Sequence, residues 1–137
     1  MSIGFRFLSV FLLLMALTAG AHYIITPLYD DGSTGFPVWR AYNWAMAVAV
    51  VVAFAASACP WLRQGGSGPE VSSVVSWLST NLRFYASLVL LLWFLNNWFA
   101  SLMNLDISIG WPFVNAIFVS LMLSSGLHLW QAGKSRP

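Results

Sequence analysis

Four long apolar stretches constrain this chain more than any other feature. They cover residues 5–25, 37–62, 83–103 and 112–132, and shorter polar segments separate them. At about 1.5 Å of rise per residue, each stretch can cross a hydrocarbon core of about 30 Å as a helix. Only 7% of the residues are charged, against about a quarter in a soluble domain. We therefore expect an all-α integral membrane protein with four transmembrane helices and a single membrane domain over residues 1–137.

Two of the polar segments share the pattern D-x-S-x-G-aromatic-P. The pattern runs from Asp31 to Pro37 and again from Asp106 to Pro112. It predicts a turn that a glycine permits, followed by a helix with proline in its first turn. Because the two copies occupy equivalent places between apolar stretches, we expect two tandem, parallel-repeat helical hairpins. They would comprise residues 5–62 and 83–132, joined by a linker and interfacial segment over 63–82.

Rows of small residues at four-residue spacing mark helix surfaces that can pack closely in lipid. The row in the second stretch is Ala41, Ala45, Ala49, Ala53 and Ser57. The matching row in the fourth stretch is Ala116, Ser120, Ser124 and His128. We expect these two helices to pair across the axis that relates the repeats.

The segment before the third apolar stretch has an amphipathic pattern. A single helix from residue 70 to 103 would be too long for one span. We therefore expect residues 70–81 to form an interfacial helix that lies on the membrane or contacts a partner. Its apolar stripe is Val71, Val74, Val75, Leu78 and Leu82.

The charges predict an orientation. Five of the six basic residues fall on one side of a four-span protein, and Arg40 falls on the other side with the aspartates. The positive-inside rule then predicts that both termini are in the cytoplasm, and we expect the protein in the cell (inner) membrane. Residues 1–21 also resemble a signal peptide, but the apolar stretch continues to Ile25, so we expect an uncleaved first helix. No basic cluster typical of nucleic-acid binding occurs, and the single cysteine excludes an internal disulfide.

The acidic loop residues are the first candidate site. Asp31 and Asp106 would lie at equivalent positions on the outer face, where carboxylates can bind a cation or a cationic ligand. The alternative is structural: an Asp before a helix caps the free N–H groups of the first turn.

Polar residues within the outer half of the membrane are the second candidate site. Residues of this kind usually face the bundle interior and often mark a ligand site, or they only join helices by hydrogen bonds. They are His22, Asn43, Asn96, Asn97 and Asn115. His22 could also bind a metal, but it lies about 20 Å in depth from His128, so the two cannot form one ligand pair.

No catalytic motif is present, and this favours a non-catalytic accessory or assembly subunit of a larger membrane complex. Such a subunit would contact other subunits and lipid, or a bound quinone or pigment. Two alternatives stay open. One is a stand-alone carrier or binding protein with an outer-facing polar vestibule, and the other is a metal-binding membrane enzyme component that uses His22.

Overall fold

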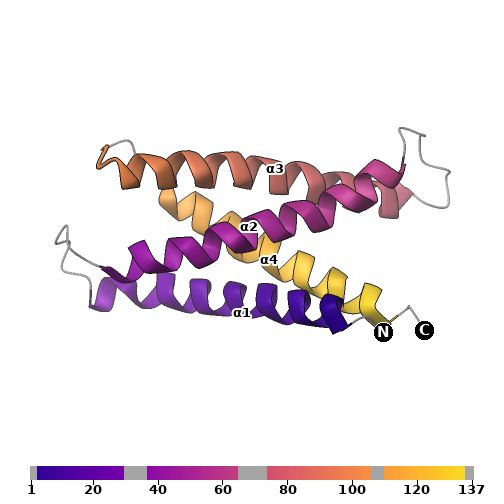
Figure 1. The fold of residues 1–137 in the computed structure, drawn as a ribbon, viewed down its shortest axis with the longest axis horizontal. Helices are drawn as coiled ribbons and strands as arrows, with labels where there is room; N and C mark the ends of the chain where they lie inside the picture. Colours follow the sequence, from indigo (N-terminus) through magenta and orange to yellow (C-terminus); the bar gives the residue numbers. More distant parts are fainter. Residues whose placement is uncertain (1–2, 30–36, 65–73, 106–109, 135–137) are drawn as a thin grey trace.

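The chain folds into four long α-helices joined by short connections (Figure 1). The computed structural model describes residues 3–29, 37–64, 74–105 and 110–134. The helices are α1 (Ile3–Ile25), α2 (Pro37–Gln64), α3 (Val74–Leu102) and α4 (Trp111–Lys134), and a 3-10 turn, η1 (Thr26–Leu28), follows α1. No strand occurs within these ranges. Each helix is long and apolar enough to cross a membrane, which confirms the predicted all-α, four-helix membrane fold.

Prolines lie in the first turns of α2 and α4, as predicted. Pro37 is the first residue of α2, and Pro112 is the second residue of α4. Immediately before α4, Gly110 has a φ of 90°, and a Cβ there would lie 2.7 Å from Cζ2 of Trp93. Only glycine satisfies both conditions, so the second loop of the repeated pattern requires its glycine.

α3 is one continuous helix where the sequence predicted two elements. It runs from Val74 to Leu102 with no break near residue 82, so the predicted interfacial segment and the predicted third span form a single helix. The reason is local: neither Gly nor Pro interrupts this segment. Its length of about 43 Å exceeds a 30 Å hydrocarbon core, so α3 must tilt or project beyond that core. Residues 70–73 lie outside the described residues.

A Schellman cap ends α3. Asn104 adopts the left-handed conformation, with a φ of 52°. The N–H of Leu105 donates to the carbonyl of Ala100 at 2.9 Å, and the N–H of Asn104 donates to that of Ser101 at 3.2 Å. These bonds satisfy carbonyls that would otherwise lack a partner at the helix end.

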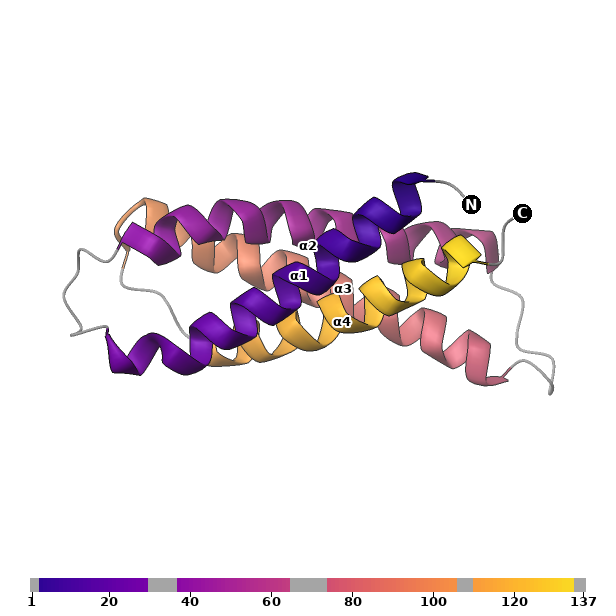
Figure 2. The ribbon, with the colours of Figure 1, turned by 90° about the horizontal axis from the view of Figure 1, so that it is seen from below.

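The helices pack in pairs that differ from the predicted hairpins. α1 packs most extensively against α4, and α2 packs most extensively against α3. Figure 2 shows α1 and α4 side by side, with α2 and α3 behind them. α2 and α4 also touch, but over a smaller area than either pair, so the predicted α2–α4 pairing is not the principal one. The tandem repeat itself stays a prediction.

The bundle has two ends that matter for function. α1 begins and α4 finishes at one end, which we call the terminal end (Figure 1). α1 finishes, α2 begins, α3 finishes and α4 begins at the other end, which we call the loop end.

A glycine explains the close contact of α1 with α4. A Cβ at Gly126 would lie 2.8 Å from Cγ of Leu13 and 3.3 Å from the carbonyl oxygen of Ser9. The Ser9 hydroxyl donates to the carbonyl of Gly126 at 2.7 Å, and this bond is buried. Small residues of this kind let helix backbones approach closely, and polar groups then bond across the contact.

The two predicted rows of small residues have different surroundings. On α2, Ala49, Ala53 and Ser57 are buried, Ala45 is half-buried and Ala41 is exposed. On α4 the row faces outward, since Ala116, Ser120 and Ser124 are exposed and His128 is half-buried. The buried surface of α4 instead contains the residues Val114, Phe118, Leu121, Met122, Ser125, Gly126 and Leu129. Large apolar side chains therefore decide which surface of α4 turns inward.

Candidate functional site

A cavity of about 590 Å³ lies at the loop end, between the ends of all four helices. We call this cavity the vestibule. Its volume falls within the range of about 300–1,000 Å³ that is typical of small-molecule sites. The residues that line it are Tyr23, Ile24, Thr26, Pro27, Trp39, Asn43, Ser101, Trp111, Pro112 and Asn115.

Aromatic side chains form much of the vestibule wall, and His22 supports one of them. The His22 ring lies 4.3 Å from the ring of Trp39, centroid to centroid. Nδ1 of His22 lies 2.6 Å from the hydroxyl oxygen of Tyr29, within hydrogen-bond distance. His22 is half-buried, and its ring packs against Trp39, which is part of the vestibule wall.

Two asparagines of the vestibule carry buried amide oxygens without a hydrogen-bond partner. Asn43 on α2 is 7% exposed and Asn115 on α4 is 6% exposed. In the described part of the chain, the Oδ1 atom of each has no hydrogen-bond donor. A buried acceptor left in this state costs about 1–3 kcal/mol. Both residues belong to the outer polar set that the sequence predicted.

The other predicted polar residues lie elsewhere. Asn97 on α3 is 1% exposed, so it is part of the bundle interior. Its neighbour Asn96 is exposed on the outer surface of α3. Asp31 and Asp106 lie outside the described residues, so the acidic site stays a prediction.

The described ranges contain no group of three or more His, Cys, Asp or Glu side chains that could hold a metal ion. His22 lies in the last turn of α1, near the loop end, whereas His128 lies in the second half of α4, toward the terminal end. The two histidines are thus far apart, as their positions in the sequence predicted.

The apolar stripe predicted as a partner surface is exposed where the structure describes it. Val74, Val75, Leu78 and Leu82 are 44%, 82%, 56% and 67% exposed, respectively. Val71 lies outside the described residues. The stripe continues along α3 at alternating spacings of three and four residues, through the exposed residues Tyr85, Val89, Leu92, Asn96, Phe99 and Met103. Asn96 is the polar member of this row.

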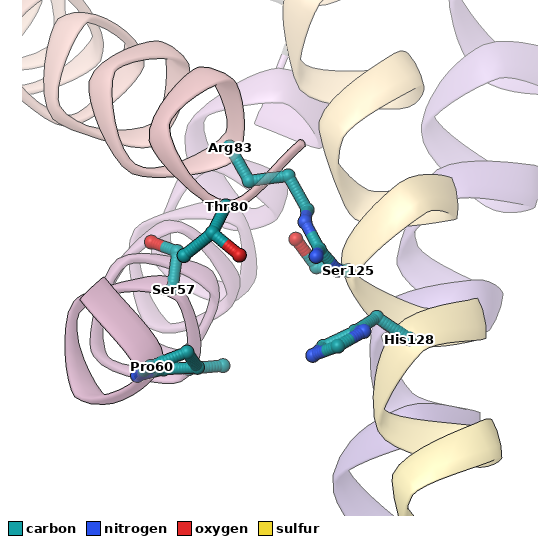
Figure 3. Close-up of a pocket in the computed structure, with 7 residues that line it drawn as sticks. Ser57, Pro60, Thr80, Arg83, Ser125 and His128 are labelled. Atoms are coloured by element: carbon teal, nitrogen blue, oxygen red, sulfur yellow. The ribbon is translucent and has the colours of Figure 1, made fainter. Parts of the chain in front are cut away.

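A second polar cluster lies between α2, α3 and α4 (Figure 3), nearer the terminal end, since His128 is in the second half of α4. Arg83 of α3 and His128 of α4 point into the space between α4 and the α2–α3 pair. Beside them, the hydroxyl oxygens of Ser57 and Ser87 lie 2.6 Å apart and join α2 to α3. The sequence placed Ser57 and His128 in packing rows and did not predict that Arg83 faces the same space.

The two tryptophans of the vestibule, Trp39 and Trp111, were not among the candidate site residues predicted from the sequence. Trp39 and Trp111 fall at the outer interface in sequence, where tryptophan is common, and each precedes an asparagine of the site by four residues on the same helix. That four-residue spacing, which places each pair on one helix face, is the signal that could have identified the site. No family model, curated protein or solved structure matches this chain.

Proposed function

We propose that this protein is a membrane binding protein that holds a small amphipathic molecule in the vestibule. The observation that supports this most is the pair of buried, unpartnered amide oxygens of Asn43 and Asn115. Rotation of each side-chain amide turns its oxygen toward the vestibule, where a ligand that donates an N–H or O–H offsets a cost of about 1–3 kcal/mol for each oxygen. Trp39 and Trp111 add flat apolar faces to the same cavity.

The chemistry of the two oxygens narrows the ligand class. A carbonyl oxygen accepts hydrogen bonds and cannot donate them. A ligand group that binds these oxygens must therefore donate, as the O–H or N–H of an alcohol, phenol or amine does, while the N–H₂ groups of the same two amides can donate to an acceptor of the ligand.

The orientation follows from the charge distribution. Arg6 and Lys134 lie at the terminal end, and Arg40 lies near the loop end. By the positive-inside rule the terminal end then faces the cytoplasm. The vestibule opens toward the outer side of the cell membrane in this arrangement, so its ligand enters from outside the cell or from the outer leaflet.

A pair of matched probes tests the proposal. 1-Naphthol carries one O–H donor, and 1-methoxynaphthalene replaces that hydrogen with a methyl group. Equilibrium dialysis against the purified chain in a neutral detergent should show naphthol binding about tenfold or more tighter, the equivalent of one recovered buried hydrogen bond. Asn43→Leu and Asn115→Leu should each reduce this preference.

The control is Asn96→Leu, which removes an exposed amide on α3. It should leave the preference for naphthol unchanged. Equal affinities of the wild-type chain for the two probes would refute the proposal, and so would an unchanged preference in both vestibule variants.

A second function is favoured by a different observation, the exposed amide of Asn96 within an apolar row on α3. Polar side chains in membrane spans usually face the interior, because an amide in lipid lacks partners. An outward-facing amide is satisfied when a neighbouring helix covers it. The chain would then be an accessory or assembly subunit of a larger membrane complex, with α3 as its contact surface.

Purification in a mild detergent with mass spectrometry of accompanying proteins tests this second function. A companion subunit that is retained by the wild-type chain and lost from Asn96→Leu would support it. The matched control is Cys59→Leu, a change at an exposed residue of α2 that should retain the companion. Purification of the wild-type chain alone as a stable monomer would count against it.

A further inference from the structure

A cationic side chain lies between helices nearer the terminal end, away from the vestibule. Arg83 of α3 and His128 of α4 line one small cavity, together with hydroxyl groups of Thr80 and Ser125. Figure 3 shows the side chains of Arg83 and His128 directed into this space from the two helices. The cavity measures about 10 Å³, which admits one water molecule or one oxygen atom of a larger group.

Arg83 has no acidic partner in the described part of the chain. Its Nε donates to the carbonyl of Ser79 at 3.2 Å, and one terminal nitrogen lies 3.5 Å from the Ser79 hydroxyl. All four Asp and Glu residues of the sequence fall outside the described ranges. A guanidinium has five N–H donors, so these two contacts leave donors for an anion.

Arg83 also stands at the head of an apolar groove between α3 and α4. The groove has a volume of about 430 Å³ and shares Arg83 with the small polar cavity. Leu82 and Ala86 form its α3 wall, and Ile117 and Leu121 lie on its α4 wall. A charged head and an apolar body in one continuous site match the two parts of a phospholipid.

The dimensions agree with this match. Along α4 the groove extends from Ser124 to Ala116, a rise of about 12 Å toward the middle of the bundle. From Arg83 to Leu102, α3 rises about 30 Å, which is the thickness of a hydrocarbon core. Arg83 therefore lies near the edge of that core, at the depth of lipid phosphates.

We propose that Arg83 and the groove bind an anionic phospholipid. The phosphate accepts charge-assisted hydrogen bonds from the Arg83 guanidinium, and His128 and Ser125 lie beside it. One acyl chain lies along the groove. The planar guanidinium suits two phosphate oxygens at once, and the apolar groove distinguishes a lipid from free phosphate.

The test uses the purified full chain in a neutral detergent, titrated separately with phosphatidylglycerol and phosphatidylcholine. Native mass spectrometry counts the bound lipid. Phosphatidylglycerol should bind about tenfold or more tighter than phosphatidylcholine, because only its headgroup has a net negative charge. Arg83→Gln should reduce the affinity for phosphatidylglycerol to the level of phosphatidylcholine, and the control Arg40→Gln, at an exposed residue near the loop end, should not.

Ser124→Phe tests the groove without changing any charge, and since Ser124 is exposed the fold should tolerate it. It should weaken phosphatidylglycerol binding by steric exclusion of the acyl chain, and it keeps the test decisive if Arg83→Gln fails to fold. Millimolar inorganic phosphate should not displace the lipid. Equal affinity for the two lipids, or unchanged binding in Arg83→Gln or Ser124→Phe, would overturn the proposal, as would full displacement by inorganic phosphate.

Discussion

Replacing Gly126 with alanine should destabilise the bundle, although the same change usually stabilises a helix. Gly to Ala in a helix interior gains about 1 kcal/mol from helix propensity. At Gly126 the new Cβ would lie 2.8 Å from Cγ of Leu13 and 3.3 Å from the Ser9 carbonyl oxygen. Overpacking of this kind costs about 1–3 kcal/mol. The expected net effect is a loss of about 0–2 kcal/mol in the free energy of unfolding.

Gly20 provides the matched control on α1. A Cβ at Gly20 would lie 3.6 Å from Cγ2 of Val119, an ordinary van der Waals contact. Gly20→Ala should therefore keep the gain of about 1 kcal/mol. The two variants should differ by about 1–3 kcal/mol, measured by far-UV circular dichroism as sodium dodecyl sulfate is titrated into a mild detergent.

A relieving substitution makes the test more specific. Leu13→Ala removes the atom that the new Cβ would strike. In the Gly126→Ala background it should therefore cost less than it costs alone, with a coupling of about 0.5–3 kcal/mol. Equal stabilisation by Gly126→Ala and Gly20→Ala, with no coupling to Leu13, would refute the close α1–α4 contact.

Three further changes test other parts of the fold. Gly110→Ala should destabilise the chain by more than about 1 kcal/mol and shift the fluorescence of Trp93, because the backbone has a positive φ and the Cβ would meet that ring. In a double-mutant cycle, Ser57→Ala and Ser87→Ala should couple by only about 0.6 kcal/mol, since each hydroxyl can donate its single proton to a carbonyl of its own helix instead of across the contact. Asn104→Gly should preserve or slightly raise the midpoint of detergent-induced unfolding, because glycine adopts the left-handed cap at no steric cost.

The sequence predicted the number of helices and most of their ends correctly. Long apolar stretches leave a chain with few charges no other way to satisfy its backbone in lipid. Proline also restricts helix starts strongly, and both α2 and α4 begin at or next to the predicted prolines, Pro37 and Pro112. These features depend on local chemistry, which is why sequence reasoning reaches them.

The predicted helix break near residue 82 does not occur, because membrane thickness sets no upper limit on helix length. A helix longer than the hydrocarbon core can tilt or project into the headgroup region. Because neither Gly nor Pro occurs between Val74 and Leu102, the helix continues without a break over this whole segment.

The predicted pairing of α2 with α4 is not the principal one, because a row of small residues does not by itself determine which helices pack together. The most extensive contact in the bundle is between α1 and α4, and it contains one glycine, Gly126, which faces the hydroxyl of Ser9. On α4 the small-residue row is largely exposed, and larger apolar side chains face inward instead. How far a helix rotates about its axis depends on all of its neighbours, which the pattern of one helix does not determine.

The vestibule was predicted in part. Depth alone identified Asn43 and Asn115 as candidates, together with Asn96 and Asn97. Which of these amides line a cavity, lie in the core or face outward depends on helix rotation and crossing. Asn96 and Asn97 illustrate this, since adjacent residues on one helix point about 100° apart and differ completely in exposure.

The most direct test of the proposed binding function is the stability of the double variant Asn43→Leu with Asn115→Leu, measured with and without 1-naphthol. Leucine has the same branched side-chain skeleton as asparagine, and the two substitutions remove both unpartnered oxygens. The empty double variant should therefore unfold with a free energy about 1–3 kcal/mol higher per substitution than the wild-type chain. Naphthol should stabilise the wild-type chain, because a ligand that binds only the folded state raises its stability, and it should not stabilise the variant. An empty variant that is less stable than the wild-type chain, and that naphthol stabilises equally, would contradict a binding site at these two asparagines.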